Sequence, residues 1–62
     1  MKLKDFLRIV PESQKIWLCY EVFIMEADNE AMSAVLSENI YNGVVIAVEA
    51  DGDILKIWVK EE

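Results

Sequence analysis

The fold is decided by residues 44–59, which read VVIAVEADGDILKIWV. Asp51-Gly52 in this stretch is a strong signal for a two-residue β-hairpin turn, because such a turn needs positive φ angles that glycine adopts at little cost. Folding the chain there lines up one aliphatic face, made of Val44, Ile46, Val48, Leu55, Ile57 and Val59. Because side chains alternate between the two faces of a strand, we expect this set to be buried against the helices of the domain.

The opposite face of the same hairpin differs from an ordinary solvent-facing surface. The predicted register places three cross-strand pairs on it, Glu49 with Ile54, Ala47 with Lys56 and Val45 with Trp58. A large aromatic ring therefore lies where water is expected, beside a β-branched residue.

The N-terminal segment predicts a short helix that ends before Pro11. Leu3, Phe6, Leu7 and Val10 recur at helical spacing, and the residue before a proline avoids helical backbone angles. Residues 15–27 then read KIWLCYEVFIMEA, a stretch rich in the β-branched and aromatic residues that are typical of strands.

Two interpretations of residues 15–27 stay open. A tight turn near Tyr20-Glu21-Val22 would give two strands, residues 15–20 and 22–27, although this turn would lack the Gly, Pro, Asn or Asp that turns favour. The alternative is one long, bent strand over Lys15–Ala27 that is exchanged between subunits. We favour the hairpin, because strands in small domains usually have about 5–6 residues.

The remaining segments complete an α+β pattern. Asp28 or Asn29 is expected to cap a second helix, in which Met32 and Val35 lie at helical spacing and Asn39 marks the end. Asn42-Gly43 predicts a turn before the last hairpin. We therefore predict a single small α+β domain over residues 1–62, with two layers and the order α-β-β-α-β-β. Its sheet is expected to be antiparallel, with both helices on one face and a strand order that the sequence leaves open.

The composition disfavours several classes of partner. The formal charge is −6, from twelve acidic and six basic residues, whereas direct binding to a nucleic-acid backbone needs clustered lysine and arginine. The longest apolar run, Val44–Val48, is far shorter than the roughly 20 residues that span a bilayer, so no membrane partner is expected. No targeting segment is visible, and the single cysteine, Cys19, favours a cytoplasmic protein.

No group of residues predicts an enzyme, a metal centre or a cofactor. The chain has no histidine, so Cys19 lacks a base to activate it and is expected to pack as a small strand residue. Glu49, Asp51 and Asp53 cluster near the hairpin tip, but the turn already explains Asp-Gly, and the spacing differs from that of a calcium-binding loop. We therefore expect no catalytic residue, no metal ligand and no cofactor.

The apolar side chains outnumber what one layer of helices can cover. A chain of 62 residues is near the lower limit for an independent core, and such domains often gain burial by oligomerisation. Phe6 and Phe23 are expected to fill the core, whereas Trp17, Val45 and Trp58 are left on the other face of the sheet. Because tryptophan is favoured at interfaces, we predict that these three residues mediate self-association, with a dimer favoured, through the outer face or an exchanged strand.

Three stretches of the chain carry a loose resemblance to a group of small proteins encoded in prophages and mobile elements of Gram-positive bacteria. They are the opening MKLKDFL, the KIWL of residues 15–18 and the ILKIWV of residues 54–59. Where that group is expected to have a polar turn between its first two strands, this chain runs Cys-Tyr-Glu-Val. The resemblance implies an accessory role in a mobile element and supplies no catalytic residue.

The sequence therefore predicts a small cytoplasmic protein-interaction module that forms a homo-oligomer and has no enzymatic activity. The alternative is an acidic inhibitor or DNA mimic that occupies a basic site on a host protein. A periodic row of carboxylates on one surface would favour the mimic, and an apolar patch would favour the interaction module.

Overall fold

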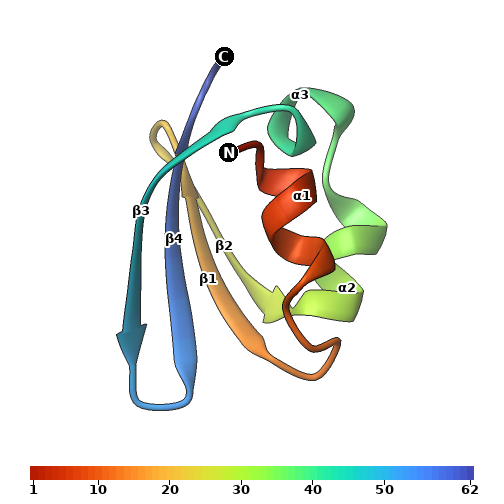
Figure 1. Ribbon diagram of the computed structural model, residues 1–62, viewed down its shortest axis with the longest axis vertical. Helices are drawn as coiled ribbons and strands as arrows, with labels where there is room; N and C mark the ends of the chain where they lie inside the picture. The colour runs from red at the N-terminus through yellow and green to blue at the C-terminus, as the bar shows by residue number, and fades with distance from the viewer.

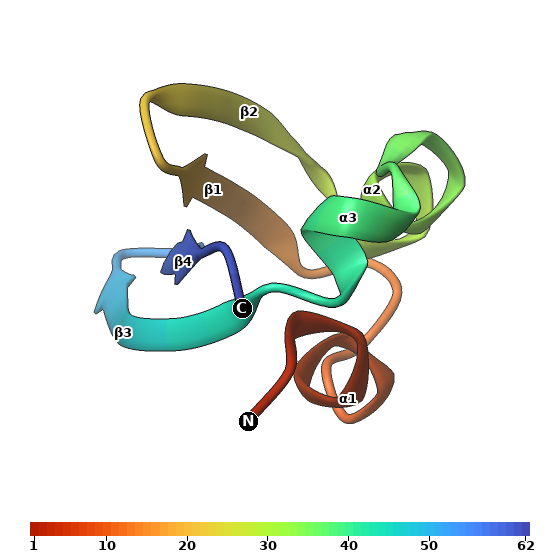
Figure 2. The ribbon, with the colours of Figure 1, turned by 90° about the horizontal axis from the view of Figure 1, so that it is seen from above.

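The computed structural model describes all 62 residues as three short helices and a four-stranded sheet (Figure 1). In chain order they are α1 (Leu3–Arg8), β1 (Lys15–Tyr20), β2 (Phe23–Asp28), α2 (Asn29–Val35), α3 (Glu38–Tyr41), β3 (Val44–Asp51) and β4 (Ile54–Lys60). The helices lie together on one face of the sheet and leave the other face open (Figure 2). The predicted α+β class is confirmed. None of the helices has the length and apolar character needed to cross a membrane.

The sheet is mixed, so the predicted antiparallel sheet is wrong. Its strand order is β2-β1-β4-β3: both hairpins are antiparallel, but β1 and β4 are parallel neighbours at the centre. Residues 29–43 carry the chain across the helical face from the edge strand β2 to the edge strand β3, so the second hairpin adds to the sheet with β4 beside β1. This connection holds one helix more than predicted, because the backbone is extended at Leu36 and Ser37 and then turns again into α3.

The first hairpin is present within one chain. β1 pairs with β2 from Lys15↔Asp28 to Tyr20↔Phe23, which leaves Glu21 and Val22 as a two-residue turn. The hairpin interpretation of residues 15–27 is therefore confirmed, and the single long strand is wrong. Glu21 takes the positive φ of 54° that the tight turn requires, in place of the glycine found at such positions.

The core lies between the helices and the two central strands. Its buried side chains come from α1, β1, α2 and β4: Leu3, Leu7, Ile16, Leu18, Met32, Ile57 and Val59. Alternation along β1 and β4 explains this set, because every second residue of a strand faces the same layer. Ile57 and Val59 were predicted to face the core, and Leu55 packs partly against it.

The β3 half of the predicted buried face is wrong. The turn of the second hairpin is Gly52-Asp53, with Gly52 at φ 62°, so Val48 lies opposite Ile57 instead of Leu55. The register shifts between Val45 and Ala47, a bulge that leaves Ile46 unpaired. Ile46 is 56% exposed and Val48 43% exposed, because β3 is an edge strand that the helices do not cover.

The N-terminal segment adds a short piece of pairing to the free edge of β3. Lys2 forms an antiparallel bridge with Val44, and Val45 N–H donates to the Met1 carbonyl at 2.9 Å. Gly43 sits at the start of this pairing, where a Cβ atom would lie 2.5 Å from Val59 Cγ1. The predicted Asn42-Gly43 turn is thus a place where glycine is needed for a close approach.

Candidate interaction surface

The open side of the sheet brings together residues that are distant in the sequence. We call it the outer face and define it by the side chains that alternate with the buried ones: Trp17, Cys19, Ile24, Glu26, Ala47, Glu49, Asp51, Ile54, Lys56 and Trp58. The parallel pairing of β1 with β4 sets its centre, because Cys19 lies opposite Trp58 and Trp17 opposite Lys56.

Trp17 and Trp58 form the aromatic centre of the outer face. Their ring centroids are 5.4 Å apart and the ring planes meet at 61°, an edge-to-face arrangement that aromatic pairs prefer. Both side chains are half-buried, because each ring shields part of the other. Cys19 is the neighbour of Trp58 on β1 and is also half-buried. The structure therefore places the two predicted tryptophans together on the open face.

Val45, the third residue of the predicted interface, lies on the opposite side of the sheet. It pairs with Val59 and packs against the core, because it precedes the bulge that reverses the alternation of β3. Val44 takes the outer side instead, opposite Lys60. Sequence reasoning missed this reversal because the bulge contains no glycine that could have marked it.

Charged side chains surround the aromatic pair. Lys56 Nζ lies 5.7 Å from the centroid of the Trp17 ring and 3.2 Å from Asp51 Oδ2. Lys15 Nζ lies 3.3 Å from Asp53 Oδ2 at the nearby hairpin tip. Exposed ion pairs of this kind contribute about 0–1 kcal/mol to stability.

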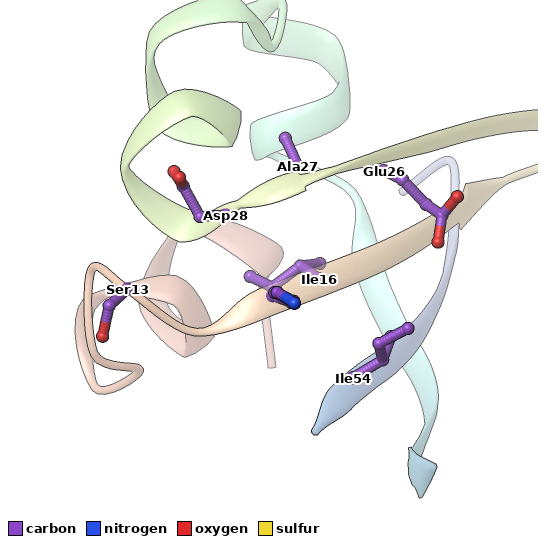
Figure 3. A pocket seen from close by; sticks show the side chains of 7 residues that line it. Ser13, Ile16, Glu26, Ala27, Asp28 and Ile54 are labelled. Carbon is purple, nitrogen blue, oxygen red and sulfur yellow. The ribbon is translucent and has the colours of Figure 1, made fainter. Parts of the chain in front are cut away.

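A hollow of about 430 Å³ opens at one end of the outer face, where β1, β2 and β4 meet the loop before β1. Its lining includes Ser13, Lys15, Glu26, Asp28 and Ile54 (Figure 3). The two carboxylates diverge, because Asp28 Oδ1 accepts the Ala31 N–H at 2.8 Å and so caps α2. Nowhere in the chain do three or more His, Cys, Asp or Glu side chains gather as metal ligands would.

The most exposed apolar residues lie at the two edges of the sheet. Phe23 is 61% exposed and Ile24 57% exposed on β2, and Val22 in the adjoining turn is 97% exposed. The prediction that Phe23 fills the core is therefore wrong: the start of β2 lies at a corner that the helices do not reach (Figure 2).

The carboxylates show no single periodic row. Glu26 and Asp28 lie on β2, Glu49 and Asp51 lie on β3 at the opposite edge, and lysines stand between the two pairs. This arrangement supplies no specific observation in favour of a DNA mimic.

Comparisons with known proteins found no match among family models, curated proteins or solved structures. The resemblance to mobile-element proteins therefore stays a prediction from the sequence.

Proposed function

We propose that this chain is a protein-interaction module that works as a homo-oligomer and meets protein partners with its outer face, centred on Trp17 and Trp58. The observation that carries the contact with protein partners is the position of this aromatic pair on the side of the sheet that no helix covers. Tryptophan is enriched at protein interfaces, where it supplies a large contact area with few rotamers to freeze.

The geometry of the pair supports this use. The edge-to-face contact between Trp17 and Trp58 already restricts both rings, so a partner would lose less side-chain entropy on binding. Exposed Ile24 and Ala47 extend the apolar centre towards both edges. Lys56 and Glu49 provide the polar rim that surrounds the apolar core of typical interfaces.

The wider role rests on the sequence. A chain with one thiol and no disulfide fits the cytoplasm, and the resemblance to mobile-element proteins supports a role as an accessory factor.

Self-association can be tested on the full chain without knowing a partner. We expect the mass from sedimentation equilibrium to rise above that of one chain between about 5 µM and 1 mM, which spans dissociation constants from micromolar to millimolar. Amide NMR signals that shift with concentration should come from the sheet, and not from α1. A mass of one chain throughout, with no shifting signal, would contradict the homo-oligomer.

A further inference from the structure

The two edges of the sheet are protected to different degrees. The edge of β3 is partly covered by the N-terminal segment, through the Lys2–Val44 bridge and a Leu3 N–H to Gly43 carbonyl bond of 2.9 Å, and the bulge after Val45 distorts the rest. β2 has no bulge, no proline and no lysine, the devices that usually prevent edge-to-edge pairing. Its edge is therefore the one suited to accept another strand.

The main chain of β2 has hydrogen-bonding groups directed outward. Asn29 N–H donates to the Gln14 carbonyl at 2.9 Å, which continues the ladder between β1 and β2. Because residues in an antiparallel pair alternate in direction, the odd-numbered residues of β2 face β1. Ile24 and Glu26 consequently turn their N–H and C=O groups to the free edge, where no strand pairs with them.

Apolar side chains accompany these groups. Val22, Phe23 and Ile24 are each more than half exposed, Met25 is partly buried, and Glu21 and Glu26 flank the run. In Figure 2 this end of β2 extends away from the helices.

We propose that two copies of the chain join their β2 strands in antiparallel fashion, with Ile24 on the two-fold axis. This inference rests on the proposed homo-oligomer and names its contact. With this axis, the outward N–H and C=O groups of Ile24 in one copy form hydrogen bonds with those of Ile24 in the other. The same register places Phe23 opposite Met25. Side chains of one face meet side chains of the same face, as an isologous contact requires.

The charges disfavour parallel pairing and any axis further along β2. About Ile24, the two Glu26 residues lie four positions apart, about 13 Å along the strands, which exceeds the ~8 Å Debye length at physiological ionic strength. Centring on Met25 would bring them to about 7 Å, and centring on Glu26 or pairing the strands in parallel would set the carboxylates side by side. A second copy that runs antiparallel about Ile24 therefore keeps the Glu26 carboxylates apart while the outward main-chain groups of Ile24 are paired.

The dimer would join two four-stranded sheets into one of eight strands. All helices would lie on one side, and both tryptophan pairs on the other, so the outer face would double without being covered. Because each copy contributes only one edge strand, we expect the contact to bury less than the ~800 Å² per partner of a standard interface. We therefore expect dissociation in the micromolar range.

The test uses two isoleucines of nearly equal exposure on opposite edges of the sheet. Ile24 is 57% and Ile46 56% exposed. Ile24→Lys should keep the mass at one chain at concentrations where the wild type is dimeric, because a lysine on the two-fold axis would meet its own copy. Ile46→Lys should associate like the wild type. Ile24→Pro should also be monomeric yet folded, since its missing N–H faces the free edge.

Crosslinking tests the register. Cys19 lies opposite Ile24 on β1, so it must first be changed to serine to prevent a disulfide within one chain. Ile24→Cys in the Cys19→Ser background should form a disulfide-linked dimer under mild oxidation, because paired Cα atoms lie about 5.5 Å apart. Ile46→Cys in that background should not crosslink.

The outcomes separate this inference from the proposed function. Association that Ile24→Lys and Ile46→Lys affect equally, or that shields the tryptophans from acrylamide quenching, would overturn the β2 contact and leave the homo-oligomer standing. A wild type that stays a single chain throughout would overturn both.

Discussion

Asn29, the first residue of α2, is buried and forms hydrogen bonds with α1 and with the loop that precedes β1. It is 3% exposed, and its Nδ2 donates to the carbonyls of Leu7 at 2.9 Å and Val10 at 2.8 Å. The Leu7 carbonyl also accepts the Val10 N–H at 3.4 Å, whereas Asn29 is the donor to the Val10 carbonyl just past the end of α1. Asn29 therefore supplies side-chain hydrogen bonds to carbonyls at the C-terminal end of α1, although it belongs to α2.

We predict that Asn29→Ala lowers the free energy of unfolding by about 2–4 kcal/mol, because it removes two hydrogen bonds and leaves the partly buried Val10 carbonyl without a donor. Urea denaturation would measure the loss. Asn39→Ala, at an exposed position of α3, serves as the control and should change stability little. Equal losses in the two variants would show that the side-chain bonds of Asn29 contribute nothing.

The role of Asn29 could not be predicted from the sequence. Asp28 and Asn29 were equal candidates for the N-cap of the second helix, and in the structure Asp28 is the N-cap residue. Local sequence does identify a capping position, because the cap and its partner are three residues apart. It does not identify partners such as Leu7 and Val10, which are about twenty residues away.

Tyr20 gives the molecule an alkaline pH dependence. Partial burial, together with the carboxylates of Glu61 and Glu21, raises the pKa of its phenol above the ordinary value of 10.0. Above pH 10 the unfolded chain therefore releases this proton more readily than the folded chain, so the stability that the neutral phenol contributes is present below this pH and falls as the pH rises.

We predict that Tyr20→Phe loses less free energy of unfolding between pH 8 and pH 11 than the wild type does. Urea denaturation at the two pH values measures both differences. Identical pH dependence in the two proteins would exclude Tyr20 as the source.

At the scale of elements, the central strands carry the core and the edge strands do not. Ile57 on β4 is fully buried, whereas Ile46 on β3 is 56% exposed. We predict that Ile57→Ala costs about 2–5 kcal/mol of stability, a large part of the total for so small a domain. Ile46→Ala removes the same atoms and should cost less than about 1 kcal/mol. Thermal or urea denaturation would measure the stability of the two variants. A similar loss at both positions would contradict the exposed position of Ile46.

Strand existence could be predicted, and strand arrangement could not. The length of residues 15–27 indicated a hairpin, although Glu21-Val22 has no turn chemistry. Alternation correctly assigned Ile57 and Val59 to the core, but it failed on β3, where one unpaired residue, Ile46, exchanges the sides of Val44 and Val45. The parallel contact of β1 with β4 leaves the same residues facing the helices as an antiparallel contact would, so the pattern of the chain does not distinguish them.

At the scale of the whole molecule, the candidate surface was half predictable. Trp17 and Trp58 follow from alternation in two separate strands, and the central pairing of β1 with β4 brings them within 5.4 Å. The exposed edge of β2 did not follow from the pattern. Phe23 looks like a core residue, and only the position of the helices, which leave the corner after Glu21 open, shows that it is not.

The net charge of the chain opposes association of two copies. Each chain carries a formal charge of −6, so two copies repel one another at neutral pH. The β2 contact places Ile24, Phe23 and Met25 at its centre and brings no lysine against a carboxylate. Association should therefore be driven by apolar burial and main-chain hydrogen bonds, against a long-range repulsion.

Added salt should consequently strengthen the dimer. Raising the ionic strength from 0.01 M to 0.1 M shortens the Debye length from about 30 Å to about 10 Å, which screens the repulsion between the copies and leaves the apolar contact intact. We predict a several-fold rise in the association constant, measured by sedimentation equilibrium in sodium chloride, while Ile24→Lys remains a single chain at both ionic strengths. An association constant that falls with salt would mean that opposite charges hold the copies together, which the β2 contact about Ile24 does not allow.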